Sequence, residues 1–449
     1  MLKYSLANNG DSTLYSYVNA FWLYYMTTVS GIPPAAAGAI AAASAVFQAI
    51  AGPFFAAWSD RFEHRLGKRR PFIIFSSVPL GLFACLMFSD LPLHGAPRIV
   101  VLFCLGAGFW VLFAAFFIPH LAWGAEIASG YDERTTIRTY SYVMYTVGFL
   151  IGSALPTLVV ERLDAAGLDA AAAWLCVTIA LAGISVGCIL YTGLSVREQP
   201  SARKSDLSSF SLKALVRDYC QVLKLRPLRL LIFAVIAYLI GNSMMVADRM
   251  YAFTFQMGFS GSFISALMLA FGILGIVLAA PMLSLAKRFD KRTTLFACLG
   301  VCGFIMAALR FAGIANTNTA PVFLLLLVYV VVSTAYYQLM SAAFYDICEV
   351  DEYENNIKRA GTITSTMPMA QALASAVGMQ LLGLRLQLGG FESGAAVQST
   401  GAIAAVYDCF TLAPGILFVV AALFMYLFPI TKQQFETIRA ELAARRESV

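Results

Sequence analysis

The chain has 449 residues, of which 60% are hydrophobic and only 12% are charged, and its mean hydropathy is +0.75. A soluble domain of this length cannot bury so much apolar surface, so the composition excludes a soluble globular protein and requires lipid as the solvent for the remainder. The formal net charge of +6 reflects basic loops on one side of a membrane rather than a nucleic-acid surface.

Twelve apolar segments recur along the chain. Each is long enough to cross about 30 Å of hydrocarbon as a helix, which takes roughly 17–25 residues. They predict an all-α polytopic membrane protein with twelve transmembrane helices. The predicted spans lie near 12–31, 37–59, 71–90, 99–126, 139–160, 170–194, 229–257, 262–285, 294–315, 321–344, 361–386 and 400–429.

The basic residues predict the orientation of these spans. Cytoplasmic loops carry an excess of Lys and Arg, and all but five of the 31 such residues fall in loops and termini of one side. We therefore expect a multi-pass protein of the inner (cytoplasmic) membrane with both termini cytoplasmic. The five exceptions are Arg98, Arg162, Arg249, Arg310 and Arg385.

The longest polar stretch, Val196–Arg229, separates spans six and seven. Apolar residues recur within it at helical spacing among Lys and Arg, which is typical of an amphipathic helix on the inner leaflet. We expect an N-terminal six-helix bundle over 1–195, a cytoplasmic linker with this helix over 196–228, a C-terminal six-helix bundle over 229–430 and a cytoplasmic tail over 431–449.

The two halves carry similar loops at corresponding places. A basic loop follows span two (Ser59–Arg70) and span eight (Ala286–Arg292), and an acidic motif follows span four (Glu126–Arg134) and span ten (Asp346–Glu354). Matching signals in two six-span halves are typical of a duplicated transporter. They predict two pseudo-symmetric six-helix bundles.

These loops resemble the signatures of the major facilitator superfamily and, within it, the glycoside–pentoside–hexuronide:cation symporters typified by melibiose permease. Ser59–Pro71 is similar to the family's Ser-Asp-Arg-x-x-x-Arg-x-Gly-Lys/Arg-Arg-Arg-Pro motif, and Pro119–Thr135 and Asp346–Gly361 are similar to its two later motifs. Three motifs in the same order over nearly the whole chain make the resemblance specific. It implies a twelve-helix carrier that moves its substrate by alternating access at one central site.

The charged residues of the loops lie at the predicted cytoplasmic mouth. Arg side chains there can pair with carboxylates or cap helix C-termini, where the helix dipole favours cations. Such contacts would close the inside of an outward-facing carrier, and solvated topology signals are the alternative interpretation. The cytoplasmic gate candidates are Asp60, Arg61, Arg65, Arg70, Glu126, Arg134 and Asp346.

The chain departs from the family at the positions that the resemblance assigns to the cation and the sugar. The acidic pair of span two falls on Gln48 and Gly52, the acidic sugar ligands of spans one and four fall on Ser12 and Phe117, and the Arg of span five falls on Tyr142. Nearly every charge used for these ligands is missing. The resemblance therefore implies the fold but not cation-coupled sugar transport.

Polar residues of the first span recur at spacings of four and three residues, which places them on one helix face. This face should point into the bundle, because polar groups exposed to lipid are costly. Similar faces on spans five, ten and eleven predict a mostly neutral cavity for a sugar, a glycoside or an amphiphile; helix packing is the alternative, and it is preferred for Gly148 and Gly152. The predicted substrate-binding residues are Asp11, Tyr15, Asn19, Trp22, Gln48, His120, Tyr142, Tyr145, Tyr337 and Gln371.

Ionisable residues within the spans are candidates for coupling transport to a proton. Asp248 and Arg249 lie deep in span seven, where a charge costs about 2.5–3.5 kcal/mol and so needs a partner or a cavity. A buried Asp that exchanges its proton with one side at a time can carry H⁺, so Asp248, Arg249 and Glu126 are the coupling candidates. A structural ion pair of Asp248 with Arg249 or Arg310 is the alternative, and for His120 it is a buried, hydrogen-bonded role.

The sequence thus predicts a secondary transporter of a sugar, glycoside or similar small solute, working by proton-coupled symport or by facilitated diffusion. A carrier of an amphiphile such as a lysophospholipid is the alternative. A membrane-embedded enzyme is a remote one, because the three histidines form no metal-spaced cluster. We expect no cofactor, no metal and no nucleic acid; the partners are the substrate, the bilayer and, for symport, a co-transported H⁺, and the chain is expected to be a monomer.

Overall fold

The computed structural model describes residues 2–62, 64–93, 95–127, 131–196, 221–312, 320–355 and 360–447. These residues form helices joined by short loops and contain no β-strand, which confirms the all-α prediction. The expected amphipathic helix of the linker over 196–228 falls largely outside the described residues.

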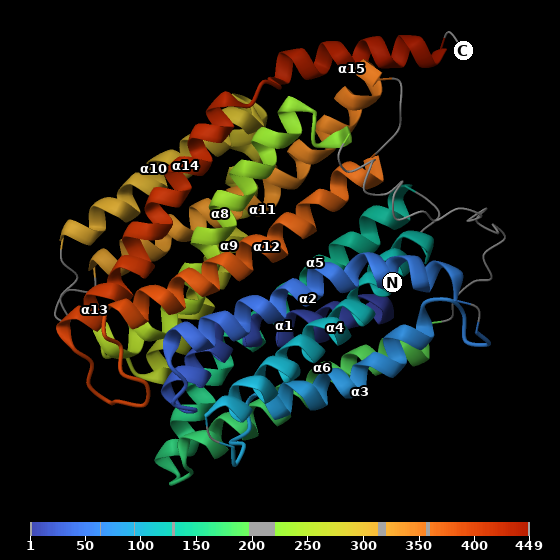
Figure 1. Cartoon of the computed structure of the whole chain (residues 1–449). Coiled ribbons are helices and arrows are strands. Elements are labelled where there is room, and N and C mark those ends of the chain that lie inside the picture. The colour runs from blue at the N-terminus through green and yellow to red at the C-terminus, as the bar shows by residue number, and fades with distance from the viewer. Residues whose placement is uncertain are drawn as a thin grey trace. The chain divides into compact units, whose positions relative to one another are not determined.

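Long helices follow one another along the chain (Figure 1). Eleven helical segments among the described residues are long and apolar enough to cross a membrane. The first expected span is a long helix but is not among the eleven, and it begins at Leu2, well before the expected residue 12. The helices are α1 (Leu2–Thr28), α2 (Pro34–Arg61), α3 (Arg70–Met87), α4 (Ala96–Ile127), α5 (Tyr131–Ala165), α6 (Ala170–Ser195), α8 (Arg226–Tyr251), η1 (Ala252–Gln256), α9 (Gly261–Phe289), α10 (Lys291–Ala312), α11 (Ala320–Asn355), α12 (Ala360–Leu388), α13 (Thr400–Tyr407), η2 (Asp408–Leu412), α14 (Ala413–Leu427) and α15 (Lys432–Glu447).

Helix α1 carries many polar residues, and the protein buries most of them. Helices α5 and α6 pack along it. Hydroxyl groups of α1 donate hydrogen bonds to backbone carbonyls of the preceding turn. The Oγ of Ser12 donates to the carbonyl of Asn8 (2.7 Å), and the Oγ1 of Thr13 donates to that of Asn9 (2.7 Å). This helix is therefore enclosed by other helices, which explains how a sequence too polar for a lipid-facing span lies within a membrane protein.

Two glycines of α5 allow this close packing. A Cβ added at Gly148 would lie 2.2 Å from the carbonyl oxygen of Asn9, and one at Gly152 would lie 2.2 Å from that of Thr13. Small residues four positions apart let two membrane helices approach at backbone distance. The predicted packing role of both glycines agrees with this geometry.

The chain divides into two compact units that do not coincide with the halves of the sequence. Unit 1 comprises Met1–Arg203, Val246–Gly272 and Ala376–Val406, and unit 2 comprises Lys204–Met245, Ile273–Ser375 and Tyr407–Val449. Unit 1 thus joins α1 to α6 with one end of α8, α9 and α12. The expected division at 1–195, 196–228, 229–430 and 431–449 stays a prediction.

Unit 2 is built around α10, which packs against α11 and α14. Tyr238 of α8 stacks on Tyr336 of α11 with ring centroids 3.8 Å apart, and on Phe418 of α14 at 4.9 Å. These three side chains are fully buried, so a continuous stack of aromatic rings ties three helices of the unit together.

Each of two membrane helices contains a π-helical turn. The segment η1 continues α8, and η2 joins α13 to α14. At the start of η2, Asp408 forms an ion pair with Arg310 of α10, whose guanidinium group also lies 5.1 Å from the ring centroid of Tyr407. Arg310 therefore has a carboxylate partner other than Asp248. Paired charges of this kind are tolerated at membrane depth.

The predicted tail contains the helix α15, which packs against α11 (Figure 1). The hydroxyl of Tyr353 donates to Glu441, and the backbone N–H of Lys432 donates to the carboxylate of Asp290 (3.2 Å). The tail helix is therefore fastened at two points to unit 2.

We expect Gly148→Ala to lower the free energy of unfolding by about 1–3 kcal/mol, because the added methyl group meets the α1 backbone and neither helix can yield without losing packing. Thermal unfolding of the purified protein in detergent measures the change. Gly183→Ala on α6 is the matched control, since a Cβ there meets nothing within 4 Å. Equal unfolding temperatures for the two variants would contradict the tight α1–α5 contact.

Candidate transport site

The predicted polar face of α1 points toward α4. The ring of Tyr15 packs on Trp110 (centroids 5.8 Å apart) and on Phe113 (5.7 Å), both of α4. The Nδ2 of Asn19 donates to the carbonyl of Tyr15 (2.8 Å), which leaves the amide oxygen as the acceptor that this side chain can offer to a ligand.

Asp11 lies at the N-terminal end of this face and is buried, with 2% of its surface exposed. Its Oδ2 atom is enclosed and accepts no hydrogen bond from the described residues. Tyr145 of α5 interacts electrostatically with both Asp11 and Tyr15, and its ring is 38% exposed. The structure therefore brings together an acid and two phenols from α1 and α5.

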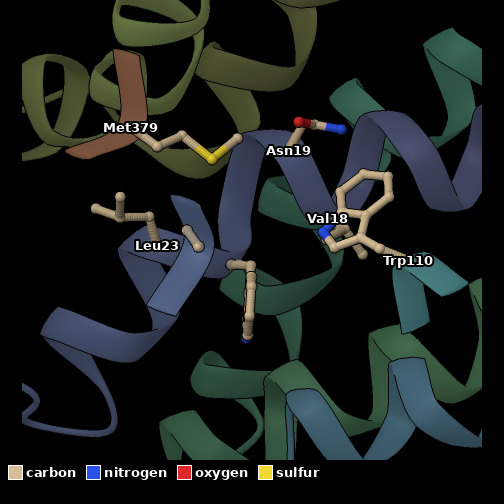
Figure 2. A pocket seen from close by; sticks show the side chains of 7 residues that line it. Val18, Asn19, Leu23, Trp110 and Met379 are labelled. Carbon is tan, nitrogen blue, oxygen red and sulfur yellow. The ribbon is translucent and has the colours of Figure 1, made fainter. Parts of the chain in front are cut away.

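A small pocket lies at the C-terminal end of the same face of α1. It is lined by Val18, Asn19, Trp22, Leu23, Ala41, Trp110 and Met379, which come from α1, α2, α4 and α12. We call it the indole pocket. Figure 2 shows the side chain of Met379 extending from α12 toward Asn19. The lining is apolar apart from one amide and two indole N–H groups.

Gly106 of α4 determines where the indole of Trp22 lies. A Cβ added at Gly106 would lie 2.3 Å from Cη2 of Trp22 and 2.5 Å from Oγ of Ser44. Trp22 is 2% exposed, and its Nε1 donates to no acceptor among the described residues. A buried N–H without an acceptor costs about 1–3 kcal/mol, so this group is a candidate for hydrogen bonding to a substrate.

The other predicted substrate residues occupy different places. Tyr142 is 59% exposed in unit 1, and Gln48 of α2 is half-buried there. Tyr337 is 52% exposed in unit 2, with its ring edge-on to Tyr336 (5.2 Å), and Gln371 of the same unit is half-buried. Their role as substrate ligands stays a prediction.

His120 lies between aromatic rings near the N-terminal end of α1 and the C-terminal end of α4. Its ring stacks on Tyr4 (4.4 Å) and on Phe116 (5.4 Å), and it is 2% exposed. The Tyr4 hydroxyl also donates to the His120 carbonyl (2.8 Å). These contacts favour the structural role over substrate binding.

Asp248 of α8 is completely buried in unit 1, and neither carboxylate oxygen accepts a hydrogen bond from the described residues. It interacts electrostatically with the hydroxyl of Tyr251, one turn further along the helix. Arg249 is only half-buried. The described residues thus offer Asp248 no ion-pair partner, and its coupling role stays a prediction.

The gate candidates are only partly described. The Nε of Arg70 donates to the carbonyl of Gly193 (2.8 Å), so this Arg caps the C-terminus of α6, as expected for a cation at that end. Asp346 forms an ion pair with Lys291 of α10 (2.6 Å) rather than with an Arg, and Arg65 is exposed. The side chains of Asp60, Arg61, Glu126 and Arg134 lie outside the part of the chain that the structure describes.

Within unit 1, helices of the two sequence halves meet at the ends opposite the basic loops, which the orientation predicts to be outside. We call these contacts the outer seam. It contains a backbone crossing of Gly38 (α2) and Gly383 (α12), where a Cβ added at Gly383 would lie 3.0 Å from the Cα of Gly38. Its hydrogen bonds join Thr27 to Tyr251 (2.6 Å), Ile32 to Ser393 (2.8 Å), Ala35 to Gln387 (3.1 Å) and Thr157 to Ser265 (2.8 Å).

Sequence reasoning missed Trp110, Met379, Gly106 and the Lys291 partner of Asp346. Trp110 and Met379 lie in apolar runs, where an indole or a thioether looks like ordinary lipid-facing or core filler. Lys291 belongs to a basic loop that was interpreted as a topology signal. One signal for Lys291 was available. The repeat between the two halves matches the basic loop Ala286–Arg292 with the basic loop Ser59–Arg70, which holds the Arg gate candidates.

Comparison with known proteins identifies the family. The sequence pattern of the family described as MFS/sugar transport protein matches residues 4–432. The isoprimeverose transporter of Lactiplantibacillus pentosus is 24% identical over 96% of this chain and 88% of its own length. The glucuronide carrier protein homolog of Escherichia coli K12 is 24% identical over 100% of this chain and 96% of its own.

Solved structures agree with this match. A bacterial homolog of the human lysosomal transporter Spinster has a TM-score of 0.71 at 14% identity and covers 97% of both chains. The D-xylose–proton symporter has a TM-score of 0.65 at 14% identity and covers 96% of both. The chain belongs to the MFS/sugar transport family and is a multi-pass membrane transporter with the major facilitator fold, as the loop motifs predicted.

We expect Gly106→Ala to weaken substrate binding, because the added methyl group displaces the indole of Trp22 from its place between α2 and α4. The KM for transport should rise severalfold, with a loss of about 1–3 kcal/mol in unfolding free energy from overpacking. Gly187→Ala on α6, where a Cβ meets nothing within 4 Å, is the matched control. If the KM of Gly106→Ala is unchanged, Trp22 does not contribute to substrate binding.

Proposed function

We propose that the protein is a secondary transporter of a neutral glycoside or sugar, which it moves by alternating access and couples to the movement of H⁺. The observation that carries this proposal is the polar face of α1. It combines a buried carboxyl group, two phenols in its surroundings, an amide and indole rings, and it contains no cationic side chain.

Sugars are recognised by such a surface. Their hydroxyl groups exchange hydrogen bonds with amides, phenols and indole N–H groups, and the apolar faces of their rings pack on aromatic side chains. The names of the relatives, an isoprimeverose transporter and a glucuronide carrier protein homolog, concern glycosidic sugars. The face of α1 in this chain supports a neutral glycoside over a charged one, because no Arg or Lys lies on it to bind a carboxylate.

Two buried acids support proton coupling over facilitated diffusion. Asp248 and the Oδ2 of Asp11 receive no hydrogen bond from the described residues. A negative charge in such surroundings is unstable, so each side chain gains from taking up a proton. Releasing this proton on the side to which the site next opens couples H⁺ to the solute. Asp248 adjoins the outer seam through Tyr251, which makes it the stronger candidate of the two.

The orientation and location complete the proposal. We infer that both termini and the basic loops lie in the cytoplasm, that the protein resides in the cytoplasmic membrane and that it acts as a monomer. The excess of Lys and Arg on one side supports the orientation.

Transport by the purified protein in proteoliposomes tests the function. We expect uptake of a labelled neutral disaccharide or alkyl glycoside above that of protein-free vesicles, and an increase in accumulation when the outside is acidified. A labelled lysophospholipid serves as the competing substrate. Transport of the lysophospholipid without transport of any sugar or glycoside would contradict the proposal.

We expect Asp248→Asn to abolish accumulation driven by a proton gradient and to retain exchange of labelled for unlabelled solute, since exchange requires no net proton release. Asp164→Asn, at an exposed position near the end of α5, should leave both activities unchanged. Accumulation by Asp248→Asn at the level of the unaltered protein would exclude Asp248 as the coupling group.

A further inference from the structure

The indole pocket lies away from the place that the family resemblance assigns to the sugar on α1. That place is Ser12, whose Oγ donates to Asn8 (2.7 Å) and packs against Gly148 of α5. Trp22 lies ten residues further along the same helix, which corresponds to about 15 Å at a rise of 1.5 Å per residue. The pocket is therefore a separate position nearer the predicted outside.

The lining of this pocket matches the chemistry of one sugar ring. The buried Nε1 of Trp22 is a donor with no acceptor among the described residues, and Asn19 can offer its amide oxygen. Val18, Leu23 and Ala41 provide apolar walls beside the indole of Trp110. A ring with one apolar face and hydroxyl groups at its edge satisfies both kinds of contact.

In this structure Met379 takes the place that such a ring would occupy. Its side chain comes from α12 and is buried, and the space left in the pocket admits no more than a water molecule. Its backbone carbonyl would lie 2.9 Å from a Cβ added at Gly38 of α2, and the Gly38–Gly383 crossing lies one turn further along α12. The outer seam thus holds Met379 in the pocket.

We propose that the indole pocket is an outer docking subsite for a single sugar ring, and that Met379 displaces this ring when the outer seam closes. The inference rests on the proposed function, because it requires α12 to leave α2 when the transporter opens to the outside. Opening of the seam withdraws Met379 and exposes Trp22 and Asn19 to the external solution. Closure returns the thioether to the indoles and moves the ring toward Asp11.

The proposed subsite predicts that a change in the pocket alters the KM differently for sugar bound from outside and sugar bound from inside. Trp22→Phe keeps an aromatic ring and removes only the N–H donor. Loss of one hydrogen bond corresponds to a change of about three- to tenfold in binding, so the KM for uptake from outside should rise by that factor. The KM measured from inside should stay within about twofold, because Met379 fills the pocket in that state. Right-side-out and inside-out membrane vesicles give the two values.

Trp174→Phe is the matched control. Its indole is also buried in unit 1, at 4% exposure, and packs on Phe21 (5.3 Å) without lining the pocket. It should leave both KM values unchanged. Met379→Leu, which keeps the volume of the side chain, should transport normally, whereas Met379→Ala should lower kcat severalfold because the sugar ring is no longer displaced.

Each outcome decides between the proposals. If the unaltered protein takes up no sugar or glycoside, the proposed function and the subsite both fail. If it does, and Trp22→Phe changes the KM equally from both sides or not at all, only the subsite is wrong. If Met379→Ala and Met379→Leu have equal kcat values, Met379 does not displace the sugar ring from the indole pocket. Should Trp22→Phe fail to fold, Trp110→Phe alters the same pocket and is judged by the same asymmetry.

Discussion

The structure depends on one constraint: a polar group at membrane depth must be enclosed by protein, paired, or offered to a ligand. Helix α1 meets this constraint in two ways. Its side toward α5 carries Ser and Thr residues that bond to their own backbone, and Gly148 and Gly152 bring α5 close enough to cover them. Its side toward α4 keeps polar atoms for which the described residues provide no partner. The first side holds the helix in place, and the second is the candidate site.

The same constraint explains the ionisable residues of the other spans. Arg310 and Asp408 neutralise each other at a π-helical turn, and Lys291 and Asp346 do so where α10 begins. Each of these charges has its partner within unit 2, and the gate role of Asp346 stays a prediction. Asp248 differs, since it is buried to the same degree as the aromatic core and accepts no hydrogen bond from the described residues. The contrast between paired and unpaired charges separates the proposed coupling group from charges that stabilise the fold.

Much of the fold could be predicted from the sequence, because span length and the distribution of Lys and Arg act over one helix at a time. The polar stripe from Asp11 to Trp22 was also readable, since a helical repeat is a local property. The start of α1 was not, because residues 2–11 include Lys3, Asn8 and Asp11, and only tertiary burial makes them part of a membrane helix. The Trp22–Gly106 contact and the approach of Met379 escaped for a similar reason: they join residues that are far apart in the sequence, and nothing local to Gly106 or Met379 indicates its neighbour.

A carrier that works by alternating access opens a polar chamber to one side of the membrane at a time. The most direct measurement is the accessibility of single cysteines at positions 19, 142, 337 and 371, in a chain whose native cysteines have been replaced, to a membrane-impermeant thiol reagent. Each cysteine should react from at least one side of the membrane, and a transported sugar should protect it. Cysteines that react from neither side, with or without sugar, would place these residues against lipid or in the sealed core and would contradict the account.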